Sequence, residues 1–418
     1  QERMLLVVRP EAVAGVRAVF DRYELAAAAI GRISDEPLIR CRAGGEEVCA
    51  IPGRALADDA PRYEISGTPP APRDADLETL AAEPASASVL LELLGSPNTR
   101  DRKPIWRRYD HMNGTNTLVG PGAGDSAVLR IKGTARALAL AIDGPGPARL
   151  GALDPYLAGA SAVLEGALNV ACSGATPIGA TDCLNFGSPE HDLGAWQLER
   201  AIDGIADACR LLGVPVVSGN VSLYNETPDG PILPTPVVGT VGLIEDRSTT
   251  IGMAWHAGDQ LWLIGDLADA PDALAASELA WGRGLRGGRA QLDLDGAAAV
   301  VRLMPRLASE GLIRAAHDAS VGGIGVALAR MAISSGVGAR VEIGAAWPTA
   351  ALFGERTGRV IVAVEPSAAD GLHAALESAG VPAIRIGTAG GDALLVRTGG
   401  TEIDVGLGEL AEAWRTPF

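Results

Sequence analysis

The most regular pattern in the chain is a set of apolar residues spaced alternately four and three positions apart. They are Leu198, Ile202, Ile205, Cys209 and Leu212. This spacing puts all five side chains on one face of a helix. Gly213 comes directly after the last of them and predicts the end of that helix. The apolar run at 214–217 is then expected to form a buried strand.

Short apolar runs between turn residues predict further strands. They lie at 127–131, 137–142, 236–244 and 260–264. Asp154 is expected to cap a helix that has Pro155 in its first turn. An Ala-rich helix is expected at 322–334, capped by Asp318 or Ser320. Strands and helices alternate without a regular βαβ repeat, which predicts an α+β (mixed α/β) fold.

The chain also contains an internal repeat. Shifting the sequence by 356 positions aligns residues 3–10 with residues 359–366, and the register continues without a gap until Glu46 meets Glu402. We interpret this repeat as a duplication. Residues 1–65 are then expected to be the last part of a domain whose second copy closes the chain, so that the chain begins within a copy and a preceding segment is missing.

Composition divides the rest of the chain. A Pro-rich break at 66–72 opens a predicted linker, 66–104, with one helix around 86–94. Two domains are expected beyond the linker, at 105–247 and 248–418, with their boundary in the polar turn 245–250. The length of 418 residues leaves ample room for several buried cores.

Charge and cysteine usage exclude several function classes. The chain has 35 basic and 51 acidic residues, a net charge of −16, which argues against neutralising nucleic-acid phosphates or anionic lipids. No apolar run of 18 residues and no export signal is seen, so no membrane role is expected. Five scattered cysteines indicate a reducing compartment. We expect a cytoplasmic protein without nucleic-acid or membrane partners.

Common catalytic and phosphate-binding motifs are missing from the sequence. It has no GxxxxGK[ST] loop, no GxSxG elbow and no HExxH helix. One GxGxxG match, at 282–287, follows a helical stretch rather than a strand and is expected to be a loop. The five histidines are dispersed, which gives little support to a hydrolase triad.

Two polar segments at predicted strand ends suit ligand binding better. They are 181–187, which contains Asp182, and 218–222, which contains Asn220. Carboxylate and amide oxygens suit Mg²⁺, and glycine backbone suits phosphate. For either segment taken alone, Asx-turns and strand caps are the more frequent explanation. Asp143 is interpreted either as a metal ligand or as a turn residue. Segment 316–323 is interpreted either as a helix cap or as an anion site. The adjacent Asp110 and His111 are either an acid–base pair or an anchor.

Several motifs occur together and in a fixed order. They are WRRYDHM at 106–112, LDPY at 153–156, CSG at 172–174, TDCLNFGSPE at 181–190 and VSGNVSLYNE at 217–226. Together they resemble the large subunit of phosphoribosylformylglycinamidine synthase. That family has two tandem units, each like aminoimidazole ribonucleotide (AIR) synthetase, and this chain resembles its C-terminal portion. The resemblance implies AIR-synthetase-like N-terminal and C-terminal domains that are duplicated in tandem in the full protein.

The resemblance also implies a ligase reaction with ATP and Mg²⁺. Formylglycinamide ribonucleotide would be converted with ammonia from glutamine to the amidine in purine biosynthesis. Carried over position by position, Asp182 and Gly219 would contact ATP, Asn220 would bind Mg²⁺, and Gln1 and Ser222 would contact the substrate. Implied partners are a glutaminase subunit, a small bridging subunit and the N-terminal half of the same enzyme.

The chain departs from the family pattern where catalysis is expected. The His-rich segment that carries the general base in the family's first unit reads GPGPAR at 144–149 here, and an Arg-Asp pair there is Leu168-Asn169 here. We therefore assign no catalytic residue to this chain and expect the isolated chain to be inactive. The alternative is a degenerate nucleotide-binding scaffold that docks a catalytic half. A related thiamine-phosphate or selenophosphate kinase agrees less well with the motifs.

Overall fold

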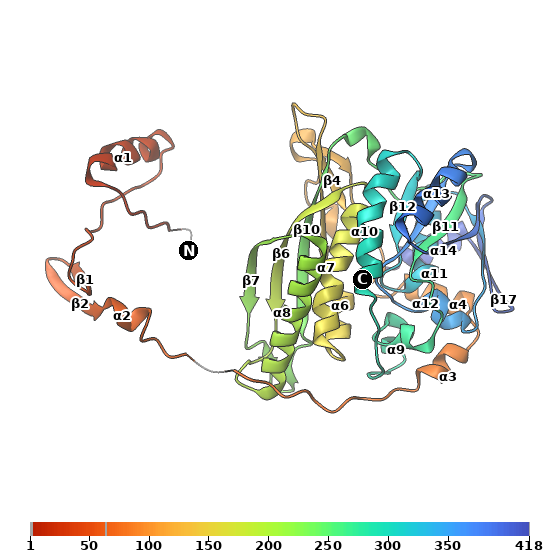
Figure 1. Ribbon diagram of the computed structural model, residues 1–418, viewed down its shortest axis with the longest axis horizontal. Helices are drawn as coiled ribbons and strands as arrows, with labels where there is room; N and C mark the ends of the chain where they lie inside the picture. Colours follow the sequence, from red (N-terminus) through yellow and green to blue (C-terminus); the bar gives the residue numbers. More distant parts are fainter. Residues whose placement is uncertain (1–2, 63–64, 418) are drawn as a thin grey trace. The chain divides into compact units, whose positions relative to one another are not determined.

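The computed structural model describes residues 3–62 and 65–417, so Gln1 lies outside the described residues. The chain forms two compact units, 1–64 and 65–418, each considered by itself (Figure 1). Among the described residues, no helix has the length and apolar character needed to cross a membrane.

The first half of the larger unit is built on a six-stranded sheet in the order β3-β4-β5-β10-β6-β7. Its strands are β3 (Thr117–Val119), β4 (Ala127–Arg130), β5 (Ala137–Asp143), β10 (Thr235–Ile244), β6 (Thr176–Asn185) and β7 (Val216–Ser222). Only β6 and β7 pair in parallel. Helices α6 (Pro145–Gly151), α7 (Pro155–Ala171) and α8 (Asp192–Leu212) cover one face of the sheet (Figure 1). Within residues 65–417, no helix covers the other face, which is called the open face below.

The local predictions for α7 and α8 are confirmed. Asp154 caps α7 by accepting a hydrogen bond from the backbone N–H of Leu157 at 3.1 Å. Gly213 ends α8 with φ 70°. The prediction of a buried strand at 214–217 is wrong: β7 begins at Val216, and Val217 is 72% exposed. Val216 and Val217 are exposed because β7 is an edge strand of the sheet.

The second half contains a seven-stranded sheet in the order β12-β14-β11-β15-β13-β16-β17. Its strands are β12 (Ala315–Asp318), β14 (Arg359–Val364), β11 (Gln260–Gly265), β15 (Ala383–Ala389), β13 (Ala339–Ile343), β16 (Ala393–Thr398) and β17 (Thr401–Gly406). Helices α10 (Leu294–Ser309) and α13 (Ala369–Ala379) pack on one face, and α11 (Gly323–Ser335), α12 (Pro348–Phe353) and α14 (Leu407–Trp414) on the other. The mixed α+β class is confirmed.

Shorter elements complete this unit. They are α3 (Leu77–Ala82), α4 (Ala87–Leu94), α5 (Lys103–Trp106), η2 (Asn113–Thr115), η3 (Arg247–Thr249), η4 (Pro271–Leu274), α9 (Glu278–Gly282), β8 (Glu226–Thr227) and β9 (Gly230–Pro231). The predicted helix near 86–94 is confirmed as α4. The segment read as a linker is not free, because leucines of α3 and α4 belong to the core under the C-terminal sheet.

The start of α11 corrects another expectation. Neither Asp318 nor Ser320 caps this helix; the N-cap residue is Gly322, and no side chain caps it. The chain enters the helix through two glycines in the left-handed region, Gly322 at φ 83° and Gly323 at φ 66°. The Gly322 N–H donates instead to Oε1 of Glu355 at 2.9 Å. Asp318 is left at the end of β12.

The smaller unit has elements that recur near the C-terminus. They are η1 (Pro10–Ala12), α1 (Val13–Arg22), β1 (Leu38–Ala43), β2 (Glu46–Pro52) and α2 (Gly53–Leu56). The first two match η5 (Pro366–Ala368) and α13 at an offset of 356, whereas β1 matches β16 at 355. The offset between the two copies therefore changes by one residue between the helix and the hairpin. The gapless register expected from the sequence is wrong.

Two strands of the repeat do not form in residues 3–62. The counterparts of β14 and β15, near 3–8 and 27–33, are irregular. In the C-terminal copy, β14 pairs with β11 and β12, and β15 pairs with β11 and β13. Residues 3–62 contain no counterparts of those partners. The β1–β2 hairpin forms because its pairing is local, whereas apolar residues such as Met4 and Ile30 stay exposed.

Candidate functional site

The strand pair β6–β7 brings four of the predicted site residues together. Asp182 lies opposite Gly219, and Ser222 lies opposite Asn185, while Asn220 follows Gly219 directly. Because side chains alternate along a strand, Asp182 and Asn220 project from opposite faces of the sheet. The site predicted from the sequence is thus one strand pair with two faces.

A row of neutral polar side chains occupies the open face. Nδ2 of Asn220 donates to Oγ of Ser222 at 2.9 Å. Oγ1 of Thr181 donates to the backbone oxygen of Ser218, also at 2.9 Å. These groups offer hydroxyl and amide contacts to a ligand but no carboxylate. A Mg²⁺ ion at Asn220 would therefore need acidic ligands from elsewhere.

Asp182 faces the helices. Burial raises the pKa of its carboxyl group. The carboxylate lies directly against Gly219, since a Cβ atom added there would be 2.5 Å from Oδ1 of Asp182. A side chain at position 219 would therefore displace the Asp182 carboxylate.

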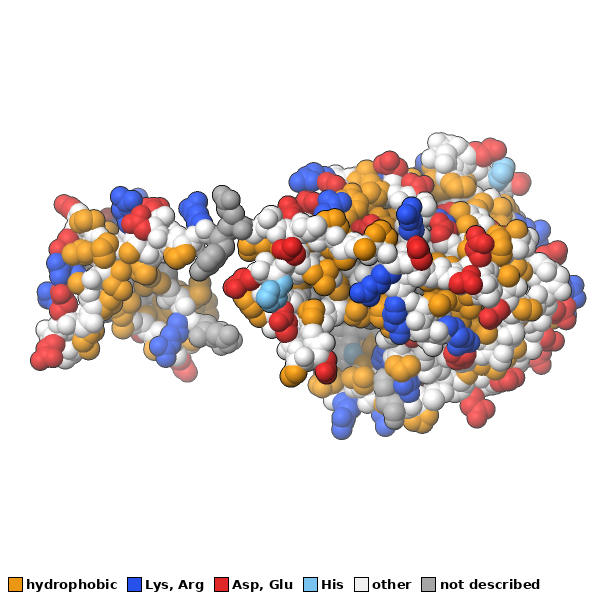
Figure 2. Space-filling view, turned by 90° about the horizontal axis from the view of Figure 1, so that it is seen from below, with side chains coloured by type: hydrophobic (Ala, Val, Ile, Leu, Met, Phe, Trp, Pro, Cys, Tyr) orange, Lys and Arg blue, Asp and Glu red, His pale blue; other side chains and the backbone are white. Residues whose placement is uncertain are grey.

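The open face is also apolar outside the polar row. Ile142 is 79% exposed, Ile178 46% and Leu140 37%. On the central strand β10, Gly239 lies opposite Ile142 of β5 on one side and opposite Thr181 of β6 on the other. The apolar and polar groups therefore share one surface. Elsewhere, Figure 2 shows acidic and basic side chains interspersed on the surface of the larger unit. A sheet face of this kind is typical of an interaction surface.

A second group of polar side chains lies inside the unit. Asp143 ends β5, and Glu165 and Asn169 lie one turn apart on α7. Nδ2 of Asn169 donates to Oδ1 of Asp143 at 2.9 Å, while Oδ2 of Asp143 is buried and has no hydrogen-bond partner. Burial, then the charge of Glu165, raises the pKa of Asp143 to about 8. Burial raises the pKa of Glu165 to about 7, against a hydrogen bond from Ser320. These oxygens suit a hard divalent cation.

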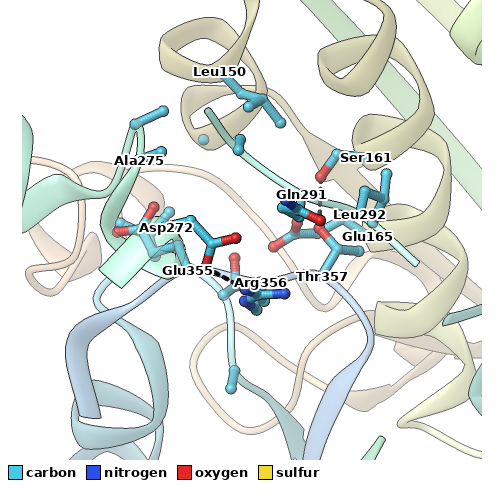
Figure 3. Close-up of a pocket in the computed structure, with 16 residues that line it drawn as sticks. Leu150, Ser161, Glu165, Asp272, Ala275, Gln291, Leu292, Glu355, Arg356 and Thr357 are labelled. Atoms are coloured by element: carbon cyan, nitrogen blue, oxygen red, sulfur yellow. Dashed lines mark hydrogen bonds and ion pairs between the residues drawn. The ribbon is translucent and has the colours of Figure 1, made fainter. Parts of the chain in front are cut away.

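A cavity of about 50 Å³ is lined in part by Glu165. Figure 3 shows Glu165 at one end, Glu355 and Asp272 at the other, and Arg356 between them. Oγ of Ser161 lies 2.6 Å from Oγ1 of Thr357 at its wall. The cavity is lined from both halves of the unit, so a ligand there would contact both.

Arg149 of α6 joins the two halves beside this cavity. Its guanidinium lies 2.8 Å from Oε2 of Glu278 and 2.7 Å from Oε2 of Glu355, and its Nε donates to the backbone oxygen of Ala276 at 2.8 Å. The Arg149 side chain is 4% exposed and both glutamate side chains are 12% exposed. This buried ion pair holds the two halves in one arrangement.

Two further sequence candidates do not form a site. Oδ1 of Asp110 accepts a hydrogen bond from the N–H of Met112 at 2.8 Å, and His111 packs edge-on against Trp106. The GxGxxG match begins in α9 and continues into a loop, with no strand before it. Glu165 was not among the site residues predicted from the sequence. Its signal is the i, i+4 spacing with Asn169 in an otherwise apolar helix.

Two family models match the larger unit. "AIR synthase related protein, N-terminal domain" matches residues 123–244, and the corresponding C-terminal domain model matches residues 256–398. Along the sequence, the two matched segments meet between the last strand of the six-stranded sheet and the first strand of the seven-stranded sheet. Both matched segments fall within the ranges predicted for the two domains.

Curated relatives share the whole length of the chain. The phosphoribosylformylglycinamidine synthase subunit PurL of Moorella thermoacetica is 43% identical over 423 residues, which cover 99% of this chain and 57% of that protein. The PurL subunit of Thermomicrobium roseum is 43% identical over 431 residues, which cover 100% and 57%. The chain thus spans little more than half the length of these relatives.

Solved structures show the same fold. T. maritima PurL complexed with FGAR matches with a TM-score of 0.62 at 19% identity, over 80% of this chain and 55% of that one. T. maritima PurL complexed with ATP matches with a TM-score of 0.57 at 22% identity, over 92% and 54%. The chain therefore belongs to the AIR synthase related family and is homologous along its whole length to part of the phosphoribosylformylglycinamidine synthase subunit PurL.

Proposed function

We propose that this chain is the C-terminal portion of the ATP-dependent ligase that converts formylglycinamide ribonucleotide and ammonia to formylglycinamidine ribonucleotide. The observation that carries the proposal is the polar row on the open sheet face, which lies on the strand pair that the motifs single out. Relatives 43% identical to this chain carry the synthase name, and solved PurL structures of the same fold hold FGAR and ATP. We place the enzyme in the cytoplasm.

In this reaction ATP phosphorylates the amide oxygen, and ammonia then displaces the phosphate. The role of this chain is to bind and orient the ribonucleotide substrate, Mg²⁺ and ATP. Ser222, and Gln1 beyond the described residues, would contact the ribonucleotide substrate. Asn220 would supply one oxygen to Mg²⁺, and Asp182 with Gly219 would contact ATP. The donor set fits Mg²⁺ only in part, because the open row lacks a carboxylate. We therefore assign the remaining acidic ligands and the general base to another segment.

The N-terminal half of the same enzyme is the partner proposed for the open sheet face. Exposed Ile142, Ile178 and Leu140 support this docking, since an apolar sheet face in water is normally covered. Packing there would place catalytic groups of the other half over the polar row. A glutaminase subunit and a small bridging subunit would complete the complex, as suggested by a solved PurLQS assembly.

The irregular segments of residues 3–62 support the proposed domain order. We propose that 1–65 is the C-terminal part of a first AIR-synthetase-like C domain, followed by a linker at 66–104, a nucleotide-binding domain at 105–247 and a second C domain at 248–418. A first copy would supply the strands that segments 3–8 and 27–33 lack. Circular dichroism should then show added strand content when the preceding segment is restored.

The test of the proposed function is an amidine-formation assay with ammonium, ATP and Mg²⁺. The isolated chain should give no product, and the chain joined to its N-terminal half should give product. In the joined enzyme, S222A should raise the KM for the ribonucleotide, whereas S309A, at the exposed end of α10, should leave KM unchanged. Equal KM values for both variants would contradict the assignment of Ser222.

A nucleotide-binding scaffold is the second candidate function. The interior group of Asp143, Glu165 and Asn169 favours it, because the unpartnered Oδ2 of Asp143 and two carboxyl groups with raised pKa values fit a Mg²⁺ ion that carries nucleotide phosphate. Titration of the isolated chain with Mg²⁺ and ADP tests it. Binding that D143N abolishes and D182A preserves supports the scaffold, and the reverse pattern supports a site at β6–β7.

A further inference from the structure

A buried group of three side chains takes no part in the proposed reaction. Asp125 precedes β4, while His317 and Asp318 end β12, so the group joins the two family domains. Nδ1 of His317 lies 2.5 Å from Oδ1 of Asp125 and 3.6 Å from Oδ1 of Asp318. One nitrogen or oxygen atom from each residue lies within 4.8 Å of the other two.

The carboxylate of Asp318 is the unsatisfied member of this group. Asp318 is 5% exposed. Its side chain approaches His317 at 3.6 Å, which is too long for a hydrogen bond, and makes no other polar contact with the described residues. A buried carboxylate without a hydrogen-bonding partner needs a proton or a cation.

An ordinary ion pair accounts for only part of the arrangement. His317 and Asp125 can form one, and Oδ2 of Asp125 also accepts the backbone N–H of Asp318 at 2.9 Å. One imidazole cannot neutralise two carboxylates. The guanidinium of Arg330 also acts on Asp318, but no hydrogen bond joins the two side chains among the described residues. Asp318 therefore keeps its ligand capacity.

We infer that Asp125, His317 and Asp318 form a binding site for a divalent transition-metal ion, with Zn²⁺ as the best match. Zn–N and Zn–O bonds of about 2.0–2.2 Å in a tetrahedron place ligand atoms about 3.4 Å apart. The 3.6 Å separation already fits this spacing. The 2.5 Å pair would open by about 1 Å as the metal replaces the proton between the two atoms.

The chemistry of the donors favours Zn²⁺ over Mg²⁺. Imidazole nitrogen is a preferred zinc ligand, whereas Mg²⁺ selects oxygen and keeps several waters. Two carboxylates and a neutral imidazole balance a charge of +2, and the Arg330 guanidinium is a further positive charge nearby. Asp125 is held in place by the Asp318 N–H and by the thiol of buried Cys172, which lies in hydrogen-bonding contact with it. Such supporting hydrogen bonds orient metal ligands.

The experiment uses the complete chain, stripped with a chelator and titrated with Zn²⁺ alone. Isothermal titration should give one tight site per chain that 5 mM Mg²⁺ does not displace. Co²⁺ in place of Zn²⁺ should give visible absorption typical of tetrahedral nitrogen and oxygen ligands. H317Q and D318N should each weaken Zn²⁺ binding at least tenfold, while H256Q, an exposed histidine elsewhere, should bind as the unaltered chain does.

Absence of stoichiometric Zn²⁺ binding to the unaltered chain would overturn the inference. Binding that H317Q leaves intact would also overturn it. Circular dichroism of each variant shows whether it is folded. If H317Q does not fold, C172A provides the second measurement, because it keeps all three ligands and removes the side-chain hydrogen bond to Asp125. C172A should weaken Zn²⁺ binding measurably, and unchanged binding in it would count against the site.

Discussion

Replacing Arg149 with methionine removes the cation that joins the two AIR synthase related domains. Arg149 contacts Glu278 at 2.8 Å and Glu355 at 2.7 Å, and all three side chains are largely buried. Removing one partner of a buried ion pair typically costs about 3–5 kcal/mol, because the other charge stays buried. Glu355 keeps hydrogen bonds from the backbone N–H groups of Glu278 and Gly322. We therefore expect R149M to lose about 3 kcal/mol, at the lower end of that range.

Urea unfolding at pH 8 measures this loss, with the fluorescence of the seven tryptophans, among them buried Trp255, as the signal. The control is R210M, which removes an exposed pair with Asp207 and should change the free energy of unfolding by less than about 0.5 kcal/mol. A loss in R149M no larger than that in R210M would refute the role given to the buried ion pair.

The same variant has a defined pH dependence. Burial raises the pKa of Glu355, and Arg149 opposes that rise. Without Arg149 the pKa of Glu355 in the folded chain should rise further, so that the folded state takes up a proton as the pH falls. The stability deficit of R149M should therefore be smaller at pH 5.5 than at pH 8. A deficit that grows on acidification would contradict this electrostatic explanation.

Three further predictions concern stability. Folding raises the pKa of Asp143 to about 8 and that of Glu165 to about 7, so above pH 4 the folded state binds more protons than the unfolded chain. The free energy of unfolding in metal-free buffer should therefore fall by several kcal/mol between about pH 4 and 8. A flat or rising profile would contradict this prediction. G159A should lose about 1–3 kcal/mol in urea unfolding, because its Cβ would lie 2.1 Å from a backbone oxygen of α8, whereas G408A, with open space around it, should not destabilise; equal losses would disprove the steric argument. D154A should lower the free energy of unfolding by about 1 kcal/mol through loss of the α7 cap, and an unchanged free energy of unfolding would show that the cap is dispensable.

Features set by neighbouring residues were predictable from the sequence. The apolar stripe of α8 and its Gly213 end follow from helical spacing, and the Asp154 cap follows from its position before Pro155. These signals depend on a few adjacent residues, so the surrounding fold does not change their meaning. The family resemblance, confirmed by the curated relatives, added the order of the two domains.

Features set by distant contacts were not predictable. The run 214–217 is apolar whether a helix or another polypeptide covers it, so its pattern could not show that Val217 is exposed. The start of α11 depends on Glu355, which lies 33 positions beyond Gly322. Local capping rules therefore pointed to the wrong residues.

The candidate site was predicted in part. Motif matching selected Asp182, Gly219, Asn220 and Ser222, but only the structure shows that they lie on one strand pair and project from its two faces. Their roles toward ATP, Mg²⁺ and substrate remain predictions. The interior carboxylate group was harder to see, because Glu165 meets Asp143 only after α7 packs on the sheet.

The most direct test of the account is amidine formation by the chain with and without its N-terminal half. With formylglycinamide ribonucleotide, ammonium, ATP and Mg²⁺ present, the isolated 418 residues should form no product, and the joined halves should form product in amounts equal to the ADP released. ATP-dependent amidine formation by the isolated chain would contradict the claim that its binding groups need a partner's catalytic groups.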